Sequence, residues 1–153
     1  MNRTFKFNTL YIGILLLVFA FSSCTSSKQL AIQKSKTAQL SRKLGFTVNR
    51  KDDLPLLEEV SRWLGTPYRY GGTTRTGADC SGFVGAVYKN VYHKSLQRTV
   101  VNIYNKDCQR IGKRRLKPGD LVFFNFSKRK KRTLNHMGIY LKNGYFAHAS
   151  TSK

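Results

Sequence analysis

Acidic residues are scarce in this 153-residue sequence, where seven Asp and Glu stand against 28 Lys and Arg for a formal net charge of +21. Cysteine is also rare, and three cysteines exclude a small domain held together by disulfides. With 41% hydrophobic residues the chain is not disordered throughout, and its length suits one domain with a sizeable core. The positive charge predicts an anionic neighbour, which leaves nucleic acid, lipid headgroups and acidic cell-wall polymers open.

Long apolar runs are absent too. Residues 10–21 carry no charge, but twelve helical residues rise only about 18 Å, short of the ~30 Å hydrocarbon core. Because Arg3 and Lys6 precede this run and small residues follow it, residues 1–23 are predicted to be a signal peptide. Its end, Ser-Ser-Cys24, resembles the lipobox of bacterial lipoproteins, in which the cysteine becomes a lipidated N-terminus. The alternative is an ordinary signal peptide that ends near a cysteine.

Three segments follow from this interpretation. After the signal peptide, we expect a lipidated Cys24 with a basic, partly helical tether over residues 24–50, and one domain over residues 51–153. The threonine after Cys24 resembles lipoproteins exported to the outer membrane, so we expect a cell-envelope protein anchored there and facing the periplasm. Export makes nucleic acid a poor partner.

Helical signals fill the first half of the predicted domain. Asp53 and Gly65 bound one apolar stripe at helical spacing, and Asp79 can cap a second helix that begins at Cys80. A glycine-rich loop joins the two, and a third helix is predicted over residues 99–107. Strands are predicted over residues 121–126, 136–141 and 145–149, the last two joined by a turn at residues 142–144. Helices followed by antiparallel strands indicate an α+β fold.

Cys80 is the candidate nucleophile. In the first turn of a helix, unpaired N–H groups and the helix dipole favour a thiolate, so we expect a lowered thiol pKa. The alternative is a small buried cysteine without chemistry.

His136 and His148 are the candidate bases, and the hairpin register decides whether they meet. A two-residue turn at Asn143-Gly144 puts the two rings on opposite faces. A three-residue loop places His148 opposite Gly138 and diagonal to His136 on one face, and we favour this register. The alternative is two unrelated surface histidines.

Six ordered motifs resemble the NlpC-type cell-wall cysteine peptidases over roughly residues 55–153. They are residues 65–72 (GTPYRYGG), 79–84 (DCSGFV), 96–99 (LQRT), 116–124 (LKPGDLVFF), 136–141 (HMGIYL) and 146–150 (FAHAS).

The resemblance implies a papain-like fold and hydrolysis of amide bonds in peptidoglycan stem or cross-link peptides. Cys80 corresponds to the nucleophile, His136 to the base, His148 to the residue that orients the base, and Tyr68 to the tyrosine beside the thiolate. No cofactor is implied, no residues show metal-ligand spacing, and we expect a monomer.

Other residues carry weaker predictions. Arg69, Arg75, Asp79 and Ser81 are candidate substrate-binding residues, although capping, packing or a solvated surface would explain them as well. Cys108 is predicted to be an idle thiol. The basic loop at residues 128–132 is either solvated or attracted to anionic wall peptides and lipid phosphates.

The chain stops five residues after His148, where the resemblance implies at least one further strand, so we expect a domain without its usual C-terminal strand. The alternatives to an active peptidase are therefore a catalytically weak, lipid-anchored wall-binding module, a truncated inactive homologue, or a basic envelope adaptor.

Overall fold

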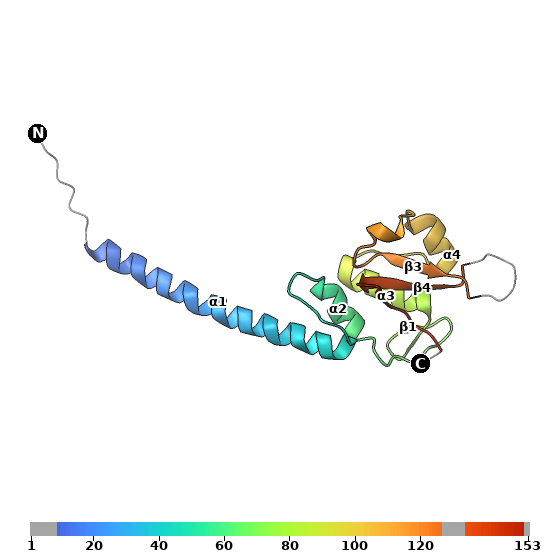
Figure 1. The fold of residues 1–153 in the computed structure, drawn as a ribbon, viewed down its shortest axis with the longest axis horizontal. Coiled ribbons are helices and arrows are strands. Elements are labelled where there is room, and N and C mark those ends of the chain that lie inside the picture. Colours follow the sequence, from blue (N-terminus) through green and yellow to red (C-terminus); the bar gives the residue numbers. More distant parts are fainter. Residues whose placement is uncertain (1–8, 127–133, 152–153) are drawn as a thin grey trace, which may run out of the picture. The chain divides into compact units, whose positions relative to one another are not determined.

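The computed structural model describes residues 9–126 and 134–151, and for residues 9–26 the backbone alone. The chain divides into two compact units, residues 1–50 and residues 51–153. The first unit holds one long helix, and the second unit holds the remaining helices and all the strands that the described residues form (Figure 1).

Helix α1 runs over Thr9–Leu44, so the predicted tether is helical to Leu44. It ends at Gly45, whose φ of +76° is the left-handed conformation that glycine adopts most readily. Arg42 and Lys43 lie in the last turn, where positive charge complements the helix dipole. Within residues 9–126 and 134–151, no helix has the length and apolar character that crossing a bilayer requires.

Helix α2 covers Leu54–Ser61 and opens the second unit. It begins as predicted at Asp53, whose carboxylate accepts a hydrogen bond of 3.1 Å from the Leu56 N–H. Its apolar stripe is buried against the core, and Trp63, just beyond the helix, makes an edge-to-face contact with Phe83 of the next helix.

The glycine-rich loop between the helices contains a small hairpin that the sequence pattern did not predict. Strands β1 (Thr73–Thr74) and β2 (Gly77–Ala78) pair antiparallel, and Tyr68 forms a further bridge to Ala78. Strands of two residues are too short to show an alternating pattern. The bridge holds Tyr68 beside the residues that start the next helix.

Helix α3 covers Cys80–Tyr92 and carries the candidate nucleophile as its first residue. The Asp79 carboxylate caps it by accepting from the Gly82 N–H at 2.7 Å. Beyond it, Thr99 caps α4 (Val100–Asn102), which continues into a π-helical turn, η1 (Ile103–Asp107), so the predicted third helix is confirmed.

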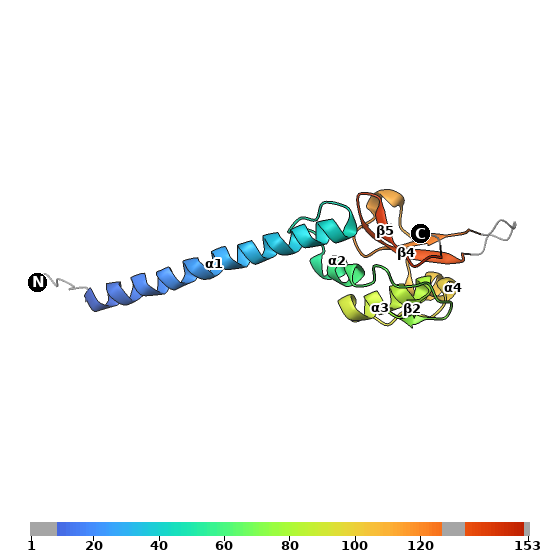
Figure 2. The same ribbon diagram turned by 90° about the horizontal axis from the view of Figure 1, so that it is seen from below.

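Strands β3 (Leu121–Phe124), β4 (His136–Lys142) and β5 (Tyr145–Ala147) form an antiparallel sheet in that order. Helix α3 packs on one side of it, against β4 (Figure 2). Met137 and Ile139 of the central strand are fully buried, and with residues of α2 and α3 they form the core.

The β4–β5 hairpin has the two-residue turn of one predicted alternative and the strand register of the other. The turn itself has two residues, Asn143 and Gly144, both with positive φ, and Lys142 pairs with Tyr145. An irregularity between Tyr140 and Lys142 then shifts the pairing. The prediction of a three-residue loop was therefore wrong, but the shift restores the strand register that this loop was expected to give.

Gly138 shows why this register suits the histidines. Ile139 pairs with Ala147, which places His148 opposite Gly138 and on the face that carries His136. A Cβ added to Gly138 would lie 2.5 Å from the Ala147 carbonyl oxygen and 3.1 Å from the His148 Cβ. Glycine is needed here because the backbone and His148 occupy the space of a side chain.

Candidate active site

Cys80 lies at the start of α3 and is 5% exposed. Its thiol receives backbone hydrogen bonds from Met137 of β4 and from the first turn of α3 itself. Since Met137 follows His136 in the chain, the predicted nucleophile lies at the end of β4 that carries the predicted base.

The pKa of Cys80 contradicts the expectation from sequence. Burial raises the pKa of the thiol above its ordinary value, and the nearby Asp79 carboxylate raises it further. The backbone hydrogen bonds lower it but do not compensate. Burial of the sulfur therefore outweighs the hydrogen bonds at the start of the helix, and the pKa of the thiol moves up instead of down.

The two histidines meet as the favoured register predicts. The Nε2 atom of His136 and the Nδ1 atom of His148 are 2.7 Å apart, and the rings are nearly perpendicular at 89°. One of these nitrogens carries a hydrogen and donates a hydrogen bond to the other. His136 is only 8% exposed, which is unusual for a histidine at the first position of a strand.

Both imidazoles favour the neutral state. Burial lowers the pKa of His136, and the neighbouring His148 lowers it further. Burial also lowers the pKa of His148. A neutral His136 can hydrogen-bond His148 through Nε2–H and keep Nδ1 free to accept a proton.

Tyr68 stands close to the thiol. Burial raises the pKa of its hydroxyl, and the neighbouring Cys80 and Asp79 raise it further. The hydroxyl therefore stays protonated near neutral pH and can donate a hydrogen bond. Tyr68 and Cys80 together line a groove of about 430 Å³, which also borders Arg98 and Asn135.

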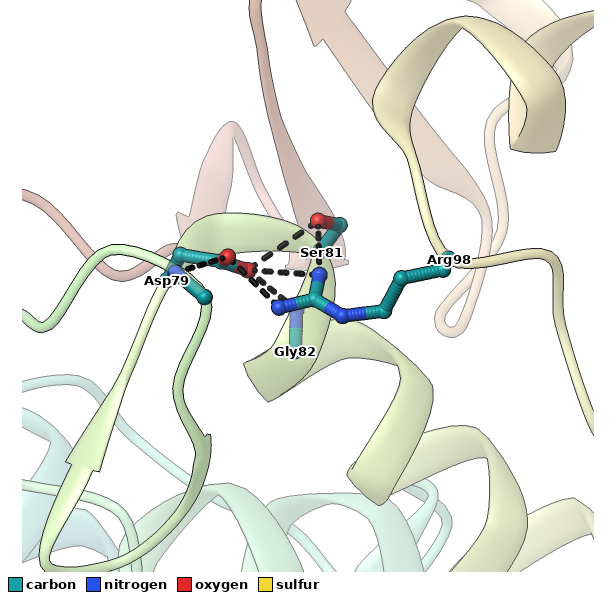
Figure 3. Close-up of polar contacts among 5 residues, drawn as sticks. Asp79, Ser81, Gly82 and Arg98 are labelled. Atoms are coloured by element: carbon teal, nitrogen blue, oxygen red, sulfur yellow. Dashed lines mark hydrogen bonds and ion pairs between the residues drawn. The ribbon is translucent and has the colours of Figure 1, made fainter.

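Arg98 organises the turn that carries the cysteine, and the sequence analysis did not select it. It forms a two-pronged ion pair with Asp79, with nitrogen–oxygen distances of 2.7 and 3.1 Å, and donates to the Ser81 hydroxyl at 2.8 Å (Figure 3). The Asp79 carboxylate also accepts from the Ser81 hydroxyl and from the Gly71 and Gly82 N–H groups. Arg98 stands in the motif at residues 96–99, which was the available signal.

These contacts fix the charge of Asp79. Burial alone would raise its pKa, but the hydrogen bonds from Arg98, Gly82 and Ser81 outweigh burial and lower it. The structure therefore gives Asp79 and Ser81 a structural role at the start of α3. Substrate binding by these two residues remains a prediction.

The two candidate arginines lie on the surface. Arg69 is exposed, and its aliphatic carbons lie where a side chain on Gly77 would otherwise fit. Arg75 is exposed in the turn of the β1–β2 hairpin. Neither lines the groove, so contact with substrate by these residues remains a prediction.

Cys108 is half-buried and has a free thiol, whose pKa burial raises. This agrees with the predicted idle cysteine. The side chain of Cys24 and the basic loop at residues 128–132 lie outside the described residues.

Comparison with known proteins identifies the family of this chain. The sequence model of the NlpC/P60 family matches residues 65–153. The chain is 45% identical over 98 residues to "Probable endopeptidase NlpC" of Escherichia coli K12, covering 64% of this chain and 62% of that protein. It is 36% identical over 97 residues to "Murein DD-endopeptidase MepS/Murein LD-carboxypeptidase" of the same strain, covering 63% of this chain and 49% of that protein.

A solved structure resembles the fold as well. The NlpC/p60 domain of the peptidoglycan hydrolase SagA aligns with a TM-score of 0.54 and 30% identity, covering 63% of this chain and 78% of that one. The predicted α+β, papain-like fold is therefore confirmed. This chain spans about half to three fifths of the length of the two E. coli relatives. The matched residues contain Cys80, His136 and His148, and the chain belongs to the NlpC/P60 family.

Proposed function

We propose that this chain is a peptidoglycan endopeptidase that cleaves amide bonds in the stem or cross-link peptides of the bacterial cell wall. The observation that carries the proposal is the His136–His148 pair, 2.7 Å between ring nitrogens, at the end of β4 where the Cys80 thiol also lies. A thiol, a base and a group that orients the base are the parts that a cysteine peptidase needs.

The reaction begins from an uncharged pair. The Cys80 sulfur attacks the carbonyl carbon of the substrate while its proton passes to Nδ1 of His136. His148 accepts from the Nε2–H of His136 and thereby holds the ring in the tautomer whose Nδ1 is free. His136 then returns the proton to the leaving amine, which departs with the carbon–nitrogen bond broken and a thioester left on Cys80.

The second half-reaction regenerates the enzyme. His136 takes a proton from water, whose oxygen attacks the thioester carbonyl, and the acid product leaves as the Cys80 thiol is restored. In both halves the carbonyl oxygen becomes an oxyanion. The Cys80 backbone N–H and the Tyr68 hydroxyl are the donors that we assign to it, and one such donor contributes ~2.7–4 kcal/mol in comparable enzymes.

The proposed substrate suits the location that we infer. Relatives named as murein endopeptidases favour wall peptides as the substrate and the cell envelope as the site of action. We infer a lipid on Cys24 as the membrane anchor, with release from the signal peptide at residues 1–23 and attachment to the outer membrane. Arg69 and Arg75 are available to pair with the carboxylates of wall peptides.

One observation favours a second candidate. Because burial raises the pKa of Cys80, the sulfur keeps its proton unless His136 is in place to accept it. A thiol is a weaker nucleophile than a thiolate. A catalytically weak wall-binding module would have this property. The two candidates differ in whether the thiol reacts.

Digestion of purified muropeptides, followed by mass spectrometry, tests the proposal. We expect the full chain to produce peptide fragments, and the Cys80→Ala and His136→Ala variants to lose this activity. Cys108→Ser is the matched control and should keep it, because Cys108 lies outside the groove. Cleavage that survives Cys80→Ala would exclude the assigned nucleophile, and binding without cleavage by the unmodified chain would support the wall-binding module.

A further inference from the structure

Five aromatic side chains form a closed circuit around the histidine pair. Going round it, the ring centroids of His136 and Phe126 are 5.1 Å apart, those of Phe126 and Phe124 5.5 Å, and those of Phe124 and Phe146 5.1 Å. Phe146 and His148 are 5.2 Å apart, and the two histidines close the circuit at 5.0 Å. We call these residues the aromatic circuit.

Phe126 is the member that the core does not explain. Its side chain is 63% exposed, whereas aromatic rings that stabilise a fold by packing are normally buried. It lies beyond the end of β3, yet its ring stacks on Phe124 at only 5° between planes. An exposed apolar ring thus lies against a buried imidazole.

Asn135 fixes the backbone that carries this ring. The Asn135 side-chain oxygen accepts from the Phe126 N–H at 2.9 Å, and the Asn135 N–H donates to the Phe124 carbonyl at 3.1 Å. Asn135 immediately precedes His136 and also borders the groove that contains Cys80. The position of the Phe126 ring is thereby tied to the start of β4.

We propose that Phe126 is a positioning residue whose ring shields the His136 imidazole from water and holds it against His148. This inference rests on the proposed role of His136 as the base. His136 is 8% exposed, and the ring centroids of Phe124 and Phe126 lie 6.2 and 5.1 Å from that of His136, so these two rings contribute to its cover. Two tilted ring contacts, from Phe124 and Phe126, limit rotation of the imidazole away from His148.

The effect on protonation follows from the groups around His136. Among the described residues, His148 at the end of β5 is the ionisable group that acts on the pKa of His136. The Cys80 thiol, with Tyr68 beside it, meets the following residue of β4. Asp79, which precedes Cys80 in the chain, forms an ion pair with Arg98. Because no described carboxylate contacts His136, burial is the main cause of its lowered pKa, and removing cover should raise that pKa.

The test compares Phe126→Ala with Phe126→Leu in the full chain. Leucine keeps an apolar cover over His136, and alanine removes it. Tyr145→Ala is the matched control, since Tyr145 is 50% exposed on the same sheet but stands outside the aromatic circuit. NMR spectra of the ¹⁵N-labelled imidazoles report the protonation of His136 against pH without any substrate.

For Phe126→Ala we expect the His136 titration to move up by about one pH unit. Phe126→Leu should move it by less than half as much, and Tyr145→Ala should leave it unchanged. A Phe126→Ala titration that matches the unmodified chain, in a variant whose thermal unfolding shows that it folds, would overturn the proposal. If Phe126→Ala does not fold, an unshifted titration in a folded Phe126→Thr variant overturns it.

Kinetics supply the second readout. With muropeptides as substrate, Phe126→Ala should lower kcat by about tenfold with a smaller change in KM, and Phe126→Leu should recover most of the loss. A change confined to KM would assign Phe126 to substrate contact and overturn positioning. Failure of the unmodified chain to cleave any muropeptide would reject the proposed function, while the NMR titration would still decide whether Phe126 shields His136.

Discussion

At the scale of single residues, Cys80 and His136 start uncharged. Burial raises the pKa of the thiol and lowers the pKa of the imidazole, so neither of them favours ionisation near neutral pH. A preformed thiolate–imidazolium pair would need the opposite shifts. The proposed mechanism therefore depends on proton transfer during attack, in which His136 acts as a general base.

This predicts the acid side of the pH profile. Protonation of His136 removes the base, and since burial lowers its pKa, kcat/KM should fall only below about pH 6.5, the ordinary value for histidine. Initial rates on muropeptides across the pH range give the midpoint. A midpoint well above 6.5 would contradict the lowered pKa of His136. Ultraviolet thiolate absorbance of Cys80 at neutral pH would indicate a preformed ion pair instead.

Arg98 supports the second residue-scale prediction. Arg98→Met leaves the buried Asp79 carboxylate with fewer donors and should lower the free energy of unfolding by about 1–2 kcal/mol at neutral pH. Because the folded state lowers the Asp79 pKa, this carboxylate stabilises the protein above its unfolded pKa and loses that contribution as the pH falls through its folded pKa. The penalty of Arg98→Met should therefore shrink in acid.

Urea unfolding at several pH values measures this penalty. Arg62→Met is the matched control, because Arg62 donates one hydrogen bond to Glu59, whereas Arg98 donates three hydrogen bonds to Asp79 and Ser81. Its penalty should be smaller than that of Arg98→Met. Equal penalties for both variants, or a penalty that grows in acid, would contradict the role assigned to Arg98.

At the scale of elements, two glycines on α3 make opposite predictions. A Cβ on Gly82 would overlap the Gly72 carbonyl oxygen, whereas one on Gly85 would meet no atom within 4 Å. Gly82→Ala should therefore destabilise the protein by about 1–3 kcal/mol, since the loop must move. Gly85→Ala should stabilise it by about 0.5–1 kcal/mol through helix propensity.

Chemical denaturation of the two variants, side by side, gives the comparison. The Gly82 variant should also lose activity, because the displaced loop carries Tyr68 and the contact of Gly71 with Asp79. Equal stabilities for the two variants would show that α3 does not pack against the glycine-rich loop as described.

The elements also show what could be predicted from sequence. Helices α2 and α3 were predictable because an aspartate cap and an apolar stripe lie within a few neighbouring residues. The β4–β5 register was predictable only in part, since the turn residues are local and the irregularity after Tyr140 depends on cross-strand packing. Hairpin β1–β2 was too short to leave a pattern.

The candidate site was also predictable only in part. Cys80, His136 and His148 stood out by residue type, position and motif, and the structure brings them to one end of β4. Arg98 was missed because its partner lies 19 residues away. The predicted direction of the Cys80 pKa shift was wrong, because burial of the sulfur depends on tertiary packing and cannot be read from its position at the start of a helix.

At the scale of the whole molecule, the inferred location depends on the lipid that we propose for Cys24. If Cys24 carries the lipid that we infer, Cys24→Ser expressed in a Gram-negative host should lose incorporation of an alkyne-labelled fatty acid and leave the membrane fraction. Cys108→Ser, the matched control, should keep both the label and the membrane fraction. A label that persists in Cys24→Ser would place the lipid on another residue, and an unmodified chain that takes up no label would exclude a lipoprotein.

The central claim is that the Cys80 sulfur forms a covalent acyl intermediate with the help of His136. Mixing the full chain with muropeptides, quenching in acid within the first turnover, and measuring the intact protein and then its proteolytic peptides by mass spectrometry tests this directly. We predict an added mass of the acyl fragment on the peptide that contains Cys80, and its absence in His136→Ala. Muropeptide cleavage with no adduct on Cys80, or an equal adduct in His136→Ala, would contradict the account.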